Sequence, residues 1–360
     1  MESRSQAIQA MFHRHFRRVA PSLLTLVATL MIHAVTDGQA RPRRTRIQFR
    51  QGELYLCSRS IPNLSGTGSY EGIVHVSIAT GAVSPLFGGP NVDFFTATAN
   101  MVYDPYRDRL LVSGRLNGQD GLYKINVNGR HGSLGFAAPP ACMAATGDGR
   151  VYISYGGPDL WLLSSTGMMS LVLDQTGTAP AQTTVPMREL FYDSSTESLI
   201  NVFSASDCAL TDDRMQLYRI PLSSDGTQLI GAPTVTSTCI VGRSNGICNG
   251  PSGQMFMTFD NNVGDSVARM VTLDPVTLAV STFACNGPYI GAPTSDAGTY
   301  SFALGKAIIL DTFNDVLRTF DYDPACMGNN GGLGSILASS GLSGPGGHSE
   351  SATLVAIERF

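Results

Sequence analysis

The side chains best equipped for chemistry in this sequence stand just before short apolar segments that are predicted to be β-strands. They supply cationic, anionic and neutral polar groups at well-separated points of the chain. Such a mixture suits a polar ligand held by hydrogen bonds and charge, provided that the fold brings the positions together. The candidate ligand-binding residues are therefore Arg188, Glu189, Asn245, Asp296 and His348.

A second candidate is the segment 242–246, which reads GRSNG and matches the G-x-S-x-G pattern of hydrolases. In those enzymes the serine sits on a sharp turn between a strand and a helix. Here an apolar strand-like segment follows instead of a helix. Of the histidines beyond residue 40, His75 falls in a predicted strand, His131 in a turn, and only His348 before a predicted inner strand. We therefore interpret this segment as a turn and not as part of a serine triad.

The acidic segment 260–265, with the sequence DNNVGD, resembles half of a calcium-binding loop. It lacks the terminal bidentate glutamate of an EF-hand loop, and no helical pattern flanks it. It is predicted to be a turn between two strands.

The elements that must position these residues form a repeat. Each unit is a short apolar strand, a polar turn and a second strand rich in Val, Ile, Leu or Tyr, followed by a third, alternating strand and a fourth. The units begin at Ile47, Met101, Cys142, Leu190, Ile247 and Tyr300, at spacings of 54, 41, 48, 57 and 53 residues. The third strands are expected at 72–77, 121–127, 160–164, 216–222, 268–274 and 317–323.

Four strands per unit predict one antiparallel sheet per unit, and six such sheets predict an all-β, six-bladed β-propeller. Ser351–Ile357 repeats the pattern of a first strand, in step with the repeat, and is expected to close the ring in the first blade. Ile47–Arg50 competes for the same place, and the sequence leaves this choice open. The segment 328–347 is expected to be a loop with a weak strand. A β-sandwich or two small β-domains are the alternatives.

Three phrases carry a family resemblance: DGRVYIS at 148–154, GPSGQMFMT at 250–258 and GLYKIN at 121–126. They resemble the NHL, YVTN and gluconolactonase-type (TolB-like) six-bladed propellers over residues 46–360. The gluconolactonase-type resemblance implies one divalent cation held by Glu189, Asn245 and Asp296. Oxygen ligands of this kind suit Ca²⁺ or Mg²⁺, and a bound cation would polarise an ester carbonyl and acidify water.

The composition restricts the class of protein. Charged residues make up only 14% of the 360, and the two lysines make a largely helical protein improbable. The formal net charge is −4, although residues 41–50 carry five arginines and no acid. The remainder of the chain is therefore clearly acidic, which argues against nucleic acid as a partner.

Residues 1–40 have the order of a secretory signal: basic residues up to Arg18, an apolar run over Pro21–Val35, and small residues at Gly38 and Ala40. We expect cleavage after Ala40 and export of residues 41–360 as a single propeller domain, to the periplasm or the extracellular space, without a stable membrane span. An uncleaved anchor is the alternative, but the apolar run is short for a span.

Seven cysteines lie beyond residue 40 and could form up to three disulfides in an oxidising compartment. Cys239 and Cys248 are the best local pair. The alternative is that several cysteines are buried as small apolar residues.

These features predict a secreted, monomeric propeller that binds a protein, a glycan or a small molecule at its central face, in preference to an enzyme. The alternative is a metal-dependent hydrolase of the lactonase or esterase type. The two differ in whether Glu189, Asn245 and Asp296 converge on a common point.

Overall fold

The computed structural model describes residues 48–358, except for 63–68, 94–100, 157–158, 174–186, 205–213, 232–233, 236–239, 242, 261–267, 284–296, 312–313, 315, 326–333, 340–341 and 343–352. The predicted signal, residues 1–40, lies outside the described residues. Residues 48–360 form one compact unit.

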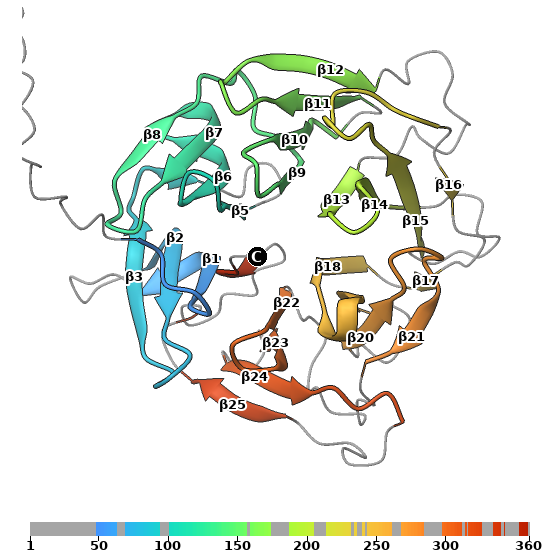
Figure 1. Ribbon diagram of the computed structural model, residues 1–360. Coiled ribbons are helices and arrows are strands. Elements are labelled where there is room, and N and C mark those ends of the chain that lie inside the picture. The colour runs from blue at the N-terminus through green and yellow to red at the C-terminus, as the bar shows by residue number, and fades with distance from the viewer. Residues whose placement is uncertain are drawn as a thin grey trace, which may run out of the picture. The chain divides into compact units, whose positions relative to one another are not determined.

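This unit consists of six antiparallel sheets arranged in a ring, as predicted (Figure 1). Blade 1 contains β26 (Thr353–Ala356), β1 (Leu54–Pro62), β2 (Ser69–Val76) and β3 (Val83–Gly88). Blade 2 contains β5 (Met101–Asp104), β6 (Arg109–Leu116), β7 (Gln119–Ile125) and β8 (His131–Ser133), with β4 (Val92–Asp93) paired to β6. Blade 3 contains β9 (Cys142–Ala145), β10 (Val151–Ser154), β11 (Leu160–Leu163) and β12 (Met169–Leu173).

Blade 4 contains β13 (Met187–Asp193), β14 (Ser198–Ser204), β15 (Arg214–Pro221) and β16 (Thr234–Val235), with β17 (Ile240–Val241) paired to β15. Blade 5 contains β18 (Arg243–Asn249), β19 (Met255–Asp260), β20 (Ala268–Leu273) and β21 (Val280–Thr282). Blade 6 contains β22 (Gly298–Ser301), β23 (Lys306–Asp311), β24 (Val316–Asp321) and β25 (Ser335–Ala338).

The innermost strands surround the centre of the ring, and each contacts the next in the order β26, β5, β9, β13, β18, β22 and back to β26 (Figure 1). The ring is therefore closed, because the innermost strand of every blade contacts that of the next blade. The one helix among the described residues is a short 3₁₀ turn at Pro251–Gly253. No helix in this part of the chain is long and apolar enough to cross a membrane.

The C-terminal strand closes the ring. β26 pairs with β1, and Leu54 lies opposite Ala356 in this register. Backbone hydrogen bonds continue the closure, from Gly52 to Ile357 at 2.7 Å and from Ile357 to Glu53 at 3.0 Å. The competing N-terminal segment forms no strand at 48–50. The choice that the sequence left open is thus settled in favour of the C-terminus.

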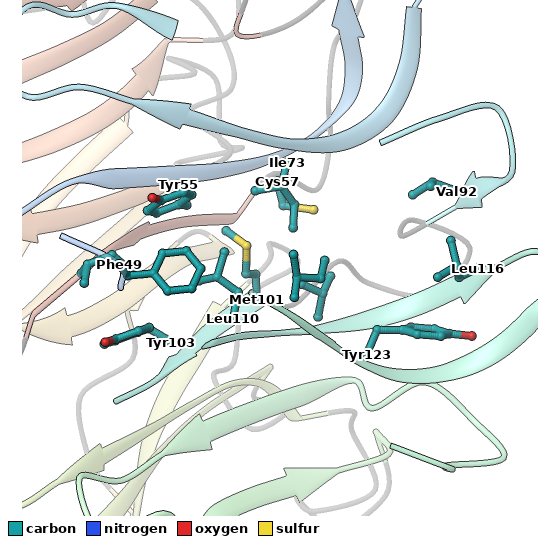
Figure 2. Packing of buried hydrophobic residues seen from close by; sticks show 13 residues of the cluster. Phe49, Tyr55, Cys57, Ile73, Val92, Met101, Tyr103, Leu110, Leu116 and Tyr123 are labelled. Carbon is teal, nitrogen blue, oxygen red and sulfur yellow. The ribbon is translucent and has the colours of Figure 1, made fainter. Parts of the chain in front are cut away.

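Phe49 explains what the N-terminal segment does instead. Its ring is buried between blades 1 and 2 and lies 5.0 Å from the Tyr55 ring and 5.8 Å from the Tyr103 ring, both edge-on (Figure 2). The aromatic side chain therefore contributes to the core between two blades while its backbone stays outside the sheet.

The core is divided into layers between neighbouring blades, because both faces of each sheet are covered. In β6, Leu110 and Val112 pack toward blade 1, whereas Leu111 packs toward blade 3. Burying each such side chain contributes about 1.5–3 kcal/mol. This explains why the inner strands are apolar at successive positions, in place of the polar-apolar alternation of a sheet with one wet face.

The weak strand expected within 328–347 is confirmed: it is β25, the outermost strand of blade 6, paired to β24. One sequence prediction needs correction. The predicted Cys239–Cys248 disulfide is wrong, because Cys248 is a free thiol, as are Cys57 and Cys142; Cys239 lies outside the described residues. The Cys248 sulfur accepts hydrogen bonds from the backbone N–H of Tyr300 at 3.2 Å and from the Thr299 hydroxyl at 3.7 Å.

Candidate functional site

The antiparallel blades give the ring two faces that carry different connections. The turns from first to second strand and from third to fourth strand lie on one face, which we call the turn face. The connections into each first strand, and from second to third strand, lie on the other, which we call the entry face. Arg188, Glu189 and Asn245 stand near the starts of the inner strands β13 and β18, so all three belong to the entry face.

A hydrogen bond between two blades marks this site. The Ser244 hydroxyl on β18 donates to the Glu189 carboxylate on β13, with 2.6 Å between Oγ and Oε2. β13 and β18 are neighbouring innermost strands (Figure 1). Hydrogen bonds to an ionised acceptor are shorter and stronger than neutral ones. This contact therefore ties blades 4 and 5 together near the centre of the entry face.

Both strands are bulged beside this hydrogen bond. In β13, Met187 pairs with Phe203 and Glu189 with Val202, so Arg188 is an extra residue. β18 has the same irregularity between Ser244 and Gly246, which makes Asn245 the extra residue. A bulge redirects side chains at the rim of a sheet and is frequent next to functional sites. Two of the five candidate residues are thus bulge residues at corresponding places in adjacent blades.

The backbone next to the site is closely packed. A Cβ atom on Gly246 would lie 2.2 Å from the carbonyl oxygen of Gly298 on β22. Only glycine permits this approach between the inner strands of blades 5 and 6. Gly246 therefore fixes where β18 runs directly after the Asn245 bulge.

Glu189 is a centre of negative charge among the inner strands. Burial, with a smaller contribution from the Glu189 charge, raises the pKa of the Cys142 thiol to about 12 and that of the Cys248 thiol to about 11. Cys142 lies on β9 and Cys248 on β18, so the carboxylate acts on both neighbours of β13. Both thiols stay protonated at neutral pH, which makes them poor nucleophiles.

The remaining predicted site residues divide into two groups. The backbones of Arg188 and Asn245 are described but their side chains are not, and Asp296 and His348 lie outside the described residues. The cation set of Glu189, Asn245 and Asp296 therefore stays a prediction. Within the described residues, no cluster of three or more His, Cys, Asp or Glu side chains is arranged to hold a metal ion.

Ser244 is the site residue that the sequence analysis undervalued. The predicted turn at 242–246 is wrong, because Arg243–Asn249 is strand β18 and no α-helix follows it among the described residues. The Gly, Ser and Asn residues there produce a bulged strand. The sequence contained one indication of this role, because Ser244 directly precedes Asn245, a candidate ligand-binding residue.

Neither a family model nor a curated protein matches the chain. Several solved structures resemble it. A chain of a nidogen/laminin complex covers 84% of this chain and 98% of its own length, with a TM-score of 0.55 and 11% identity. The WD40 propeller domain of Doa1 covers 80% of this chain and 79% of its own length, with a TM-score of 0.45 and 12% identity. A gluconolactonase from Xanthomonas campestris covers 64% of this chain and 76% of its own length, with a TM-score of 0.43 and 13% identity.

The likeness to the nidogen/laminin complex shows the fold and nothing finer, because one propeller fold serves many functions. The other two structures have TM-scores below 0.5 and carry no argument.

Proposed function

We propose that this protein is an exported binding propeller that recognises a small polar ligand, or a polar group displayed on a glycan or protein, at the centre of its entry face. The observation that carries the proposal is the Ser244–Glu189 hydrogen bond between two bulged inner strands. Export is supported by the signal-like order of residues 1–40.

The chemistry of the pair defines the ligand. A carboxylate accepts hydrogen bonds and attracts cations, and a serine hydroxyl both donates and accepts. Glu189 and Ser244 are each half-buried, so a ligand reaching them would be shielded from part of the solvent. The ligand that fits is one with several hydrogen-bond donors, such as a sugar with adjacent hydroxyls or an ammonium group.

A metal-dependent lactonase is the second candidate, and it rests on the same residues. Glu189 and the bulge residue Asn245 stand on neighbouring inner strands, which is the placement that a shared cation would require. Their oxygen-bearing types fit Ca²⁺. A divalent cation there would polarise a lactone carbonyl and lower the pKa of a bound water.

The experiment follows the melting temperature of the protein with Ca²⁺, Mg²⁺, Mn²⁺ or Zn²⁺, and separately with a panel of mono- and oligosaccharides and polyamines. A ligand at 100 times its Kd stabilises the fold by about 2.7 kcal/mol, which raises the melting temperature by roughly 5 °C. Glu189→Gln should abolish the shift and Ser244→Ala should reduce it. Hydrolysis of a lactone in step with a metal-induced shift would favour the lactonase.

Glu197→Gln is the matched control. Glu197 is exposed in the turn between β13 and β14, so this variant makes the same chemical change at the opposite end of the same hairpin. A shift that survives Glu189→Gln, or one that is lost equally in Glu197→Gln, would contradict the proposed site.

A further inference from the structure

Three side chains on blade 1 form a hydrogen-bonded row that is separate from the entry-face site. The Ser84 hydroxyl of β3 lies 3.3 Å from Nδ1 of His75 on β2. Nε2 of the same imidazole lies 2.9 Å from Oε2 of Glu53, which immediately precedes β1. The order serine, histidine, carboxylate is that of a nucleophile, a base and the group that orients the base.

The contact with Glu53 determines which nitrogen of His75 acts as a base. A carboxylate accepts hydrogen bonds, so the neutral imidazole carries its hydrogen on Nε2 and donates it to Glu53. Nδ1 then keeps its lone pair and accepts the hydrogen bond from the Ser84 hydroxyl. The two nitrogens have exchanged the roles that they play in the familiar serine triad, while the chemistry of the row is the same.

The sheet holds the row in place. In the strand register, His75 lies opposite Ser84 on one side and opposite Tyr55 on the other. The Tyr55 ring lies 5.2 Å from the imidazole, at 35° to it. The side chains of Glu53 and His75 are only 14% and 29% exposed, whereas Ser84 is exposed on the outermost strand. The base and its orienting group are thus sheltered, and the hydroxyl is accessible.

We propose that Ser84 is a nucleophile that takes the acyl group from small activated carboxylic esters. His75 is the general base and Glu53 is the positioning residue. In the first step the Ser84 oxygen bonds to the ester carbonyl carbon, and the hydroxyl proton moves to Nδ1 of His75. The bond from that carbon to the leaving oxygen then breaks, and the leaving alcohol takes the proton from Nδ1.

In the second step water attacks the acyl-serine, again giving its proton to Nδ1. The serine oxygen leaves and recovers that proton, so the products are one carboxylic acid and one alcohol. The edge position of β3 accommodates small, unhindered esters. Leu86 and Phe87, partly buried on the same strand, offer apolar contact to a short acyl chain.

The test measures covalent labelling of the full-length protein by a fluorophosphonate probe and by p-nitrophenyl acetate, with the labelled residue located by peptide mass spectrometry. Ser84 should carry the adduct, and Ser84→Ala should remove it. His75→Gln should slow the labelling about 100-fold or more, which is the lower end of general-base effects.

Ser281→Ala is the matched control, because Ser281 is also exposed on an outermost strand, β21, but lies opposite Thr272 and not a histidine. This variant should label at the wild-type rate. An absence of adduct at Ser84, or equal labelling rates for wild type and His75→Gln, would overturn the proposal.

Glu53 acts through His75, so its test separates orientation from folding. Glu53→Ala should slow the labelling of Ser84, and Glu53→Gln, whose amide oxygen can still accept from Nε2, should restore part of the rate. A purely structural role would instead lower the melting temperature of both variants and leave the labelling rate of the folded protein unchanged. These outcomes do not depend on the entry-face site, whose Glu189→Gln variant should label normally.

Discussion

The two faces of the propeller are built differently. On the turn face, the turns between first and second strands are short, namely 105–108, 146–150, 194–197, 250–254 and 302–305. On the entry face, most connections into the inner strands are longer in sequence, such as 174–186 between β12 and β13 and 283–297 between β21 and β22. The entry-face connections carry or adjoin the candidate ligand-binding residues.

Among the described residues, several contacts between blades lie on the turn face. The Arg107 guanidinium of blade 2 donates to the Gly149 and Ser164 carbonyl oxygens of blade 3, at 2.9 and 3.4 Å. The Tyr152 hydroxyl of blade 3 donates to the Gly226 carbonyl of blade 4 at 3.0 Å. These contacts couple blade 2 to blade 3 and blade 3 to blade 4. These contacts show that the turn face helps to hold the blades together, and the entry face is the one that we propose for recognition.

Removal of the closing strand should have the largest effect. A chain ending at residue 350 lacks β26, loses the buried Leu354 and Ile357, and leaves the inner edge of β1 unpaired. The two lost side chains alone correspond to about 4–10 kcal/mol, and an unpaired edge recruits other chains. We expect an insoluble product, measured as soluble yield and by size-exclusion chromatography. A chain ending at Glu358 is the control, and a soluble 1–350 chain with the wild-type urea midpoint would refute the closure.

Asp104→Ala on the turn face should be the next largest change. Asp104 is fully buried, and its carboxylate accepts from Arg109 Nε at 2.9 Å and from Arg107 Nη1 at 3.0 Å. The variant leaves the largely buried Arg109 without this partner. The free energy of unfolding, measured with urea, should therefore fall by about 3–5 kcal/mol. On the entry face, Asp120→Ala breaks the exposed pair with Arg115, so its unfolding midpoint should stay close to that of wild type. Equal losses in the two variants would contradict the difference between the faces.

Two glycine substitutions compare the turn face with the entry face without changing any charge. Gly81 has φ +68°, and a Cβ there would lie 1.9 Å from the Leu337 carbonyl oxygen of blade 6. Gly118, in the entry-face turn between β6 and β7, has φ +77° with nothing within 4 Å. Gly118→Ala should lower the free energy of unfolding only by the backbone strain of a non-glycine residue at this φ, about 1–2 kcal/mol. Gly81→Ala should lower the free energy of unfolding by more, because the added Cβ would also force blades 1 and 6 apart. Thermal unfolding of both variants checks the order.

The smallest expected effect is a dependence on pH. Hydrogen bonds from the Ser223 hydroxyl, and from the Thr227 N–H and hydroxyl, lower the pKa of Asp225 on the turn face to about 2. Because this pKa is lower than in the unfolded chain, the stabilisation is present above pH 4 and is lost as the pH falls toward 2. Asp225→Asn should therefore flatten the decrease of the urea midpoint between pH 5 and 2.5. An unchanged pH profile would show that the turn contributes nothing to acid sensitivity.

The sequence predicted the blades because each is a local structure. The pairing of neighbouring strands depends on apolar alternation and on turn residues close together in the chain, as in Met101–Asp104 and Arg109–Leu116. Arg188, Glu189 and Asn245 were assigned to the entry face for the same reason, because they stand at the starts of predicted inner strands. The prediction failed for the disulfide of Cys248, because spacing along the chain does not distinguish a paired cysteine from a buried free thiol.

The sequence by itself thus determined the all-β class, the six repeats and the face on which three candidate residues lie. Only the tertiary structure decided which end of the chain closes blade 1, because Ile47–Arg50 and Ser351–Ile357 carry similar local patterns and differ in what they pair with. It also decided that Ser244 meets Glu189, since that contact crosses two blades and depends on a bulge in each. The row of Ser84, His75 and Glu53 likewise exists only because the register of three strands aligns residues that no sequence motif connects.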